Sequence, residues 1–157
     1  MSAFTLENPV FVAFAIAAAL TVYKVIGQGW ISIFLMLKSG AGWASPEDLR
    51  PGLINRAPDP SQLDARSDVE RSRRMHRNDL ENIPAFWMAG LLFVATEPPL
   101  ILAQLLFYGF VAARLGHFWA YGTAKSHELR ATFYTIASLI IAGMAAYVLW
   151  VTLGAAG

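Results

Sequence analysis

The chain has 157 residues, of which 56% are hydrophobic, 13% aromatic and 15% charged, and its mean hydropathy is +0.46. Soluble domains carry about a quarter charged residues, so this composition argues against a disordered chain or a nucleic-acid-binding protein and favours an integral membrane protein. The sequence contains no cysteine, which excludes disulfides, protein thiolate nucleophiles and thiolate metal sites.

The first membrane-spanning helix is predicted over residues 8–37, where uncharged runs flank a single internal lysine, Lys24. About thirty residues at ~1.5 Å each exceed a hydrocarbon core of ~30 Å, so this helix must tilt or protrude. It lacks the basic start of a cleaved signal peptide, so we expect it in the mature protein. Residues 38–66, rich in Gly, Pro, Ser and Asp, are predicted to form one loop.

The second span is predicted over residues 68–96. Its apolar part, residues 82–96, is shorter than the ~20 residues that a span needs, so the helix must begin among charged residues. Ser67 and Glu70 have the spacing of a capping box, which indicates a helix start at this point. Two consecutive prolines directly after Glu97 predict the end of the helix.

The third and fourth spans are predicted over residues 99–121 and 129–154. Every lysine and arginine except Lys24 lies between spans one and two, between spans three and four, or on the adjoining helix ends. The positive-inside rule therefore places both of these connections in the cytoplasm and both termini on the opposite side. The expected fold is all-α, with residues 1–157 forming a single domain that is a four-helix membrane bundle.

Three of the predicted helices carry polar stripes near the cytoplasmic surface. Their members recur at helical spacing and are Arg74, Arg77, Asn78 and Glu81 in the second helix, Arg114, His117 and Tyr121 in the third, and Arg130 and Tyr134 in the fourth. Polar groups at this depth need protein partners or a water-filled cavity. The stripes predict a basic pocket for an anionic, hydrogen-bonding ligand, and a structural polar core is the alternative.

The remaining polar residues within the spans have simpler interpretations. Lys24 has no nearby acid in sequence, and Asp79, which points off the stripe of its helix, is its expected partner in a buried ion pair. His76 and His127 are interpreted as surface or interfacial residues. A haem held by His76 and His117 is disfavoured because His76 lies off the polar face.

The run of residues 70–82, followed by Phe86, resembles the signature of the membrane-associated proteins in eicosanoid and glutathione metabolism. The similarity extends over nearly the whole chain. It includes Lys24, the loop Pro46-Glu47-Asp48, Arg114 with His117 and Tyr121, and Arg130 with Tyr134. This resemblance implies a homotrimer of four-helix subunits that binds glutathione between neighbouring subunits, in a pocket open toward the cytoplasm.

The resemblance also implies which residues contact glutathione. By position they are Arg74, Arg77, Asn78, Glu81, His117, Tyr121, Arg130 and Tyr134. Arginines suit the two carboxylates of glutathione and Glu81 suits its ammonium group. Arg130 is the implied catalytic residue because a guanidinium at a helix N-terminus favours a thiolate. Lowering a thiol pKa from ~8.5 to ~6.5 requires about 2.7 kcal/mol of differential stabilisation.

Two positions depart from the prostaglandin synthase branch of that family. Ala131 stands where that branch has a serine thought to assist the thiol, as in the glutathione transferase branch. The basic cluster that follows the first span is reduced here to Lys38, which is the remaining candidate for a contact with the neighbouring subunit's ligand.

The expected function is that of a membrane-bound glutathione transferase acting on hydrophobic electrophiles from the bilayer, a detoxification activity that could extend to peroxidase activity toward lipid hydroperoxides. No metal and no nucleic acid are expected. The host membrane would be the inner membrane in a bacterium or the endoplasmic reticulum in a eukaryote.

Three alternatives remain open at this stage. A prostaglandin E synthase-like isomerase is disfavoured by Ala131, and a non-catalytic lipid-binding protein would not need the stripe that contains Arg77 and Glu81. A channel or transporter subunit would need a continuous polar path. The apolar stretches 82–96 and 131–157 contain none.

Overall fold

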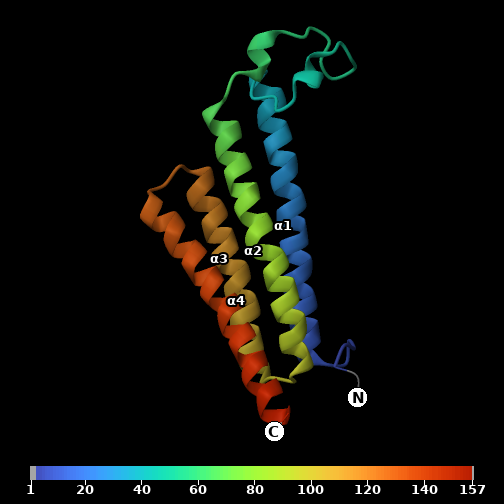
Figure 1. Ribbon diagram of the computed structural model, residues 1–157, viewed down its shortest axis with the longest axis vertical. Coiled ribbons are helices and arrows are strands. Elements are labelled where there is room, and N and C mark those ends of the chain that lie inside the picture. Colours follow the sequence, from blue (N-terminus) through green and yellow to red (C-terminus); the bar gives the residue numbers. More distant parts are fainter. Residues whose placement is uncertain (1–2, 157) are drawn as a thin grey trace.

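The computed structural model describes residues 3–156, and this part of the chain is helical with no β-strand (Figure 1). The long helices are α1 (Pro9–Ser39), α2 (Ser67–Ala95), α3 (Leu100–Gly122) and α4 (His127–Ala156), and the short 3-10 helices are η1 (Pro46–Leu49) and η2 (Pro60–Leu63). The all-α prediction is confirmed, and each predicted boundary lies within about two residues of the observed one.

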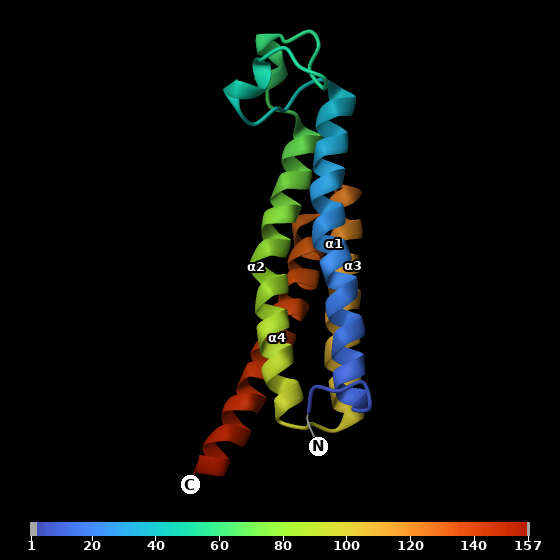
Figure 2. The same cartoon turned by 90° about the vertical axis from the view of Figure 1, so that its right-hand side faces the viewer.

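The four long helices form an elongated bundle. Helix α1 packs on α2 and α3, α4 packs on the same two helices, and α2 also contacts α3. The connection from α1 to α2 and the connection from α3 to α4 lie at one end, and both termini lie at the other (Figures 1 and 2). This arrangement confirms that the two basic connections share one end of the molecule.

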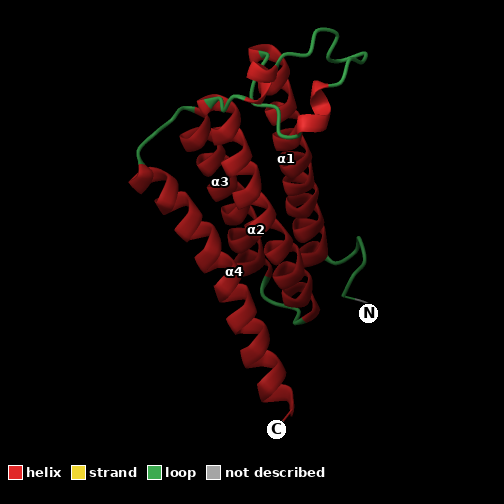
Figure 3. Ribbon diagram, turned by 45° about the horizontal axis from the view of Figure 1, so that its top comes forward, coloured by secondary structure: helices red, strands yellow, loops and turns green. Residues whose placement is uncertain are grey.

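Three of the helices, α1, α3 and α4, are long and apolar enough to cross a membrane. Helix α2 has a charged first half, but it runs alongside the other three through the bundle (Figure 3). The second half of α4 diverges from the bundle in Figure 2, and it exposes large apolar side chains such as Leu149 and Trp150. Such an apolar surface suits a lipid or protein environment rather than water.

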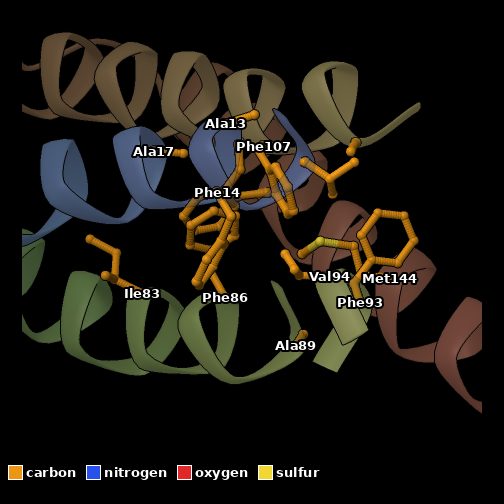
Figure 4. Close-up of a cluster of buried hydrophobic side chains, with 14 of the residues drawn as sticks. Ala13, Phe14, Ala17, Ile83, Phe86, Ala89, Phe93, Val94, Phe107 and Met144 are labelled. Carbon is orange, nitrogen blue, oxygen red and sulfur yellow. The ribbon is translucent and has the colours of Figure 1, made fainter. Parts of the chain in front are cut away.

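A cluster of aromatic side chains forms the centre of the hydrophobic core. Phe86 stacks on Phe110 with ring centroids 4.0 Å apart and ring planes 3° from parallel. Phe14 and Phe107 converge on the same cluster from α1 and α3 (Figure 4). These rings belong to the apolar parts of α1, α2 and α3, where they pack tightly. The polar residues of the same helices lie nearer the looped end of the bundle.

Two glycines allow the helices to approach closely. A Cβ atom at Gly90 of α2 would lie 2.5 Å from the ring of Phe14 in α1. A Cβ atom at Gly116 of α3 would lie 2.3 Å from the ring of Phe133 in α4. Both distances are far inside van der Waals contact, so a side chain at either position would displace the facing ring or the helix that carries it. Gly116 therefore sets how closely the first turns of α4 sit against α3.

The start of α2 differs from the prediction. Ser67 is already helical, Arg66 is the N-cap residue, and no side chain caps this end, so the predicted capping box is wrong. The backbone carbonyl of Arg66 instead accepts the Glu70 amide at 2.8 Å. Residues 40–66 are also more ordered than a single irregular loop, because they contain η1 and η2. Arg73 of α2 holds this segment by donating to the Gly42 carbonyl at 2.6 Å.

Candidate functional site

An open cavity of about 210 Å³ lies where α2, α3 and the first turns of α4 meet. Its lining residues are Asn78, His117, Tyr121, His127, Arg130, Ala131 and Tyr134. Three different helices thus bring together most of the residues that the sequence stripes predicted to meet. The polar side chains at the cavity wall include amide, imidazole, phenol and guanidinium groups, and none of the lining residues is acidic.

The position of Arg130 is defined by α3 and by the turn that precedes α4. Its guanidinium carbon lies 4.6 Å from the centroid of the Tyr121 ring, a cation–π contact. Its Nε donates to the Ser126 carbonyl at 3.3 Å. The ring of His117 also contacts the Tyr121 ring, with centroids 4.8 Å apart and ring planes tilted by 50°. Tyr121 therefore connects the imidazole and the guanidinium within one wall of the cavity.

The electrostatics of this cavity favour an anion. Arg130 carries a full positive charge, and it stands in the first turn of α4, where the helix dipole contributes a partial positive charge. The Ser126 hydroxyl accepts the Leu129 amide of that turn at 3.4 Å. Ala131 offers no hydrogen-bonding side chain. A carboxylate or thiolate placed here would meet positive charge and hydrogen-bond donors.

The other predicted ligand residues lie outside this cavity in the single chain. Arg74, Arg77 and Glu81 are exposed on α2, on the helix face that they share with Asn78. Lys38 is exposed in the last turn of α1. One chain alone therefore does not unite all the predicted contacts, and a role for these four residues in ligand binding stays a prediction.

A buried charged cluster lies behind the cavity. Lys24 of α1 forms the predicted ion pair with Asp79 of α2, and their side chains are 8% and 0% exposed. Arg114 of α3 pairs with the second oxygen of Asp79 and is 1% exposed. Arg114 was predicted to share the polar face of His117 and Tyr121, but its guanidinium is turned toward Asp79 and does not line the cavity. A buried guanidinium needs an acidic partner, and Asp79 provides one for Arg114.

Sequence interpretation missed one lining residue. His127 was interpreted as a surface or interfacial residue, and it is exposed, but as the first residue of α4 it also lines the cavity. Helical spacing could have predicted this position, because Arg130 and Tyr134 follow His127 by three and seven residues and therefore share its helix face. That prediction would have required α4 to begin at His127, two residues earlier than we predicted.

The sequence matches the MAPEG family over residues 14–150. This chain therefore belongs to the MAPEG family, the membrane-associated proteins in eicosanoid and glutathione metabolism, as its α2 signature indicated. It is 33% identical to prostaglandin E synthase of Homo sapiens over 146 residues, which cover 92% of this chain and 91% of that protein.

Relatives of a second kind are also similar. The chain is 40% identical to microsomal glutathione S-transferase 1 of Sus scrofa over 119 residues, 75% of each chain. It is 37% identical to microsomal glutathione S-transferase 1 of Bos taurus over 141 residues, 89% of each chain. Similarity to both kinds of protein points to a glutathione-dependent membrane enzyme.

Proposed function

We propose that this protein is a membrane-bound glutathione transferase that joins glutathione to hydrophobic electrophiles. The observation that carries the proposal is the placement of Arg130, which lies at the N-terminal turn of α4, over the Tyr121 ring, in a cavity without acidic side chains. Relatives named glutathione S-transferase support glutathione as the co-substrate. Ala131 favours the transferase over the isomerase because the residue that follows Arg130 lacks the serine hydroxyl that the resemblance assigns to the isomerase branch.

Arg130 would stabilise the glutathione sulfur as a thiolate. Lowering the thiol pKa from ~8.5 to ~6.5 needs about 2.7 kcal/mol, which a guanidinium and a helix terminus can supply together outside bulk water. The thiol proton passes to solvent. In conjugation of a nitrohalobenzene, the thiolate forms a carbon–sulfur bond and the halide leaves with the electrons of the carbon–halogen bond.

The same thiolate could reduce a lipid hydroperoxide. Its sulfur attacks the terminal oxygen, the oxygen–oxygen bond breaks, and the departing alkoxide takes up a proton. A second glutathione thiol then displaces the sulfenic oxygen as water, so two glutathione molecules are oxidised to one disulfide. This peroxidase activity needs no further group from the protein than conjugation does.

The rest of the glutathione site would come from assembly as a homotrimer. Arg74, Arg77 and Glu81 are exposed on a helix that lies within an apolar bundle, and charged side chains at such positions are costly against lipid. A neighbouring copy that covers this face would remove them from lipid and complete the pocket. Lys38 would then contact the ligand held mainly by the neighbouring subunit.

The membrane arrangement follows from the same features. We propose that α2 crosses the bilayer with the other three helices and that the looped end, which carries the cationic connections, faces the cytoplasm. Apolar electrophiles dissolved in the bilayer would reach the cavity between helices. The host membrane would be the inner membrane of a bacterium or the endoplasmic reticulum of a eukaryote.

The test uses the purified protein in detergent. Addition of glutathione should produce the ultraviolet absorbance of a thiolate near neutral pH, and the protein should conjugate glutathione to a nitrohalobenzene. Arg130→Leu should abolish both signals, whereas Arg56→Leu, in an exposed part of the loop, should retain them. A normal thiolate signal in Arg130→Leu would overturn the role given to Arg130.

A second candidate function is supported by the similarity to prostaglandin E synthase. The comparison of conjugation with isomerisation of a prostaglandin endoperoxide separates the two functions. Ala131→Ser should raise isomerisation relative to conjugation because it places a hydroxyl donor in the cavity, whereas Ala142→Ser, on an exposed face of α4, should change neither. Efficient isomerisation by the unmodified protein would favour the second candidate.

A further inference from the structure

Arg114 makes its contacts through one terminal nitrogen. The Nη2 atom donates to Asn78 Oδ1 at 2.9 Å and to a carboxylate oxygen of Asp79. Since Nη2 carries two hydrogens, these two acceptors use both of them. Arg114 is 1% exposed and does not line the cavity, so it acts on the cavity only through its neighbours.

The first neighbour is Asn78. A guanidinium is a donor only, so Asn78 must turn its oxygen toward Arg114, which leaves its Nδ2 group for another direction. Within residues 3–156 this Nδ2 donates to no protein atom, and Asn78 lines the cavity. The contact with Arg114 therefore makes Asn78 a donor, and not an acceptor, at the cavity wall.

The second neighbour is His117. Its Nδ1 lies 3.5 Å from Arg114 Nη2 in a long hydrogen bond, in which the guanidinium can only be the donor. A positive group at this distance disfavours a proton on Nδ1 and favours the tautomer with its hydrogen on Nε2. His117 also lines the cavity, so this tautomer supplies a second donor from the same wall.

The geometry assigns to Arg114 the role of a positioning residue that turns Asn78 and His117 into hydrogen-bond donors for an anionic group of glutathione held beside Arg130. This inference rests on the proposed function for the identity of the ligand. Asp79 is the acceptor that holds the guanidinium in place, and Lys24 adds the second cation to that acid.

The unpaired atoms of Arg114 support a positioning role. In the part of the chain that the structure describes, its Nε and Nη1 atoms are buried and have no hydrogen-bond partner. Buried donors without partners are costly, and buried ion pairs are weak evidence for stability. The contacts of Arg114 that the structure shows are therefore concentrated on Nη2, which faces Asn78, Asp79 and His117, the three side chains that a positioning role involves.

The first experiment measures the tautomer without glutathione. The sequence contains three histidines, so His76→Gln with His127→Gln leaves His117 as the only signal for ¹⁵N-labelled histidine NMR. We expect the hydrogen on Nε2 in this background and a mixture of both tautomers after Arg114→Met. A dominant Nδ1–H form in the Arg114-containing protein would overturn the inference, even if Arg114→Met fails to fold.

The second experiment measures glutathione binding by Arg114→Met in the otherwise unmodified chain. We expect about tenfold weaker affinity, equivalent to about 1.4 kcal/mol, and a smaller thiolate fraction at neutral pH, because two donors lose their orientation. Thr21→Val is the matched control because Thr21 is buried and polar, binds Trp87 and lies outside the cavity.

The two experiments separate failure of the inference from failure of the proposed function. Unchanged binding and an unchanged tautomer in a folded Arg114→Met protein would exclude the positioning role. If the unmodified protein binds no glutathione, the proposed function fails, and the tautomer measurement still decides what Arg114 does to His117.

Discussion

The guanidinium of Arg130 lies over the ring of Tyr121, with 4.6 Å between the guanidinium carbon and the ring centroid. The two residues come from different helices, α4 and α3, and both line the same cavity. This contact places a positive charge at the cavity wall without neutralising it, because an aromatic ring attracts a cation but carries no net charge. Arg130 therefore remains available to an anionic ligand.

Removal of the Tyr121 ring should weaken catalysis. Tyr121→Leu removes a cation–π contact of about 0.5–1 kcal/mol at a partly exposed site, so Arg130 should lose its defined position and kcat/KM for conjugation should fall by about twofold to fivefold. Tyr121→Phe keeps the ring and is the matched control. Equal losses in both variants would show that the hydroxyl, and not the ring, matters.

Substitution of Gly116 should disturb the contact between α3 and α4. A Cβ atom there would lie 2.3 Å from the Phe133 ring, so Gly116→Ala should destabilise the protein by about 1–3 kcal/mol despite the higher helix propensity of alanine. Gly109→Ala, whose Cβ would lie 3.5 Å from Ile140, should be neutral or stabilising. Denaturation in detergent measures both changes, and a stabilised Gly116→Ala would contradict the prediction.

Removal of the buried carboxylate alone should destabilise the protein more than removal of the carboxylate together with one of its cationic partners. Asp79→Asn leaves Lys24 and Arg114 without a counterion and should cost about 3–5 kcal/mol of stability. The double variant Lys24→Met/Asp79→Asn should recover part of this loss. Asp64→Asn, on an exposed loop residue, should have little effect. Additive losses in the double variant would argue against coupling between Lys24 and Asp79.

Glu81 should contribute more to glutathione binding than to folding. It is exposed in the single chain, so Glu81→Gln should insert and fold normally, but it should weaken glutathione binding by about tenfold if it pairs with the ammonium group. Glu47→Gln, in η1, is the exposed acidic control. Calorimetric titration measures glutathione binding, and it should be compared with membrane insertion for both variants. Impaired insertion with normal binding would support the structural polar core instead.

Much of the fold could be predicted from the chain alone. Long uncharged runs, the charges between them and the two prolines after Glu97 predicted four helices with ends within about two residues of the observed ones, because burial in a membrane allows few alternatives to a helix. Helical spacing also placed Asn78 on one stripe and Asp79 off it. The ion pair between Lys24 and Asp79 followed because a lone buried charge requires a partner.

Only the tertiary structure decided how each helix is rotated and which partner each long side chain takes. Arg114 shares a helical face with His117, yet its flexible side chain reaches Asp79, because a buried charge without a partner is costly. His127 joined the cavity because α4 begins there. Periodicity determines angles within one helix, whereas the meeting of three helices around a cavity depends on packing between them, such as the close approach at Gly116.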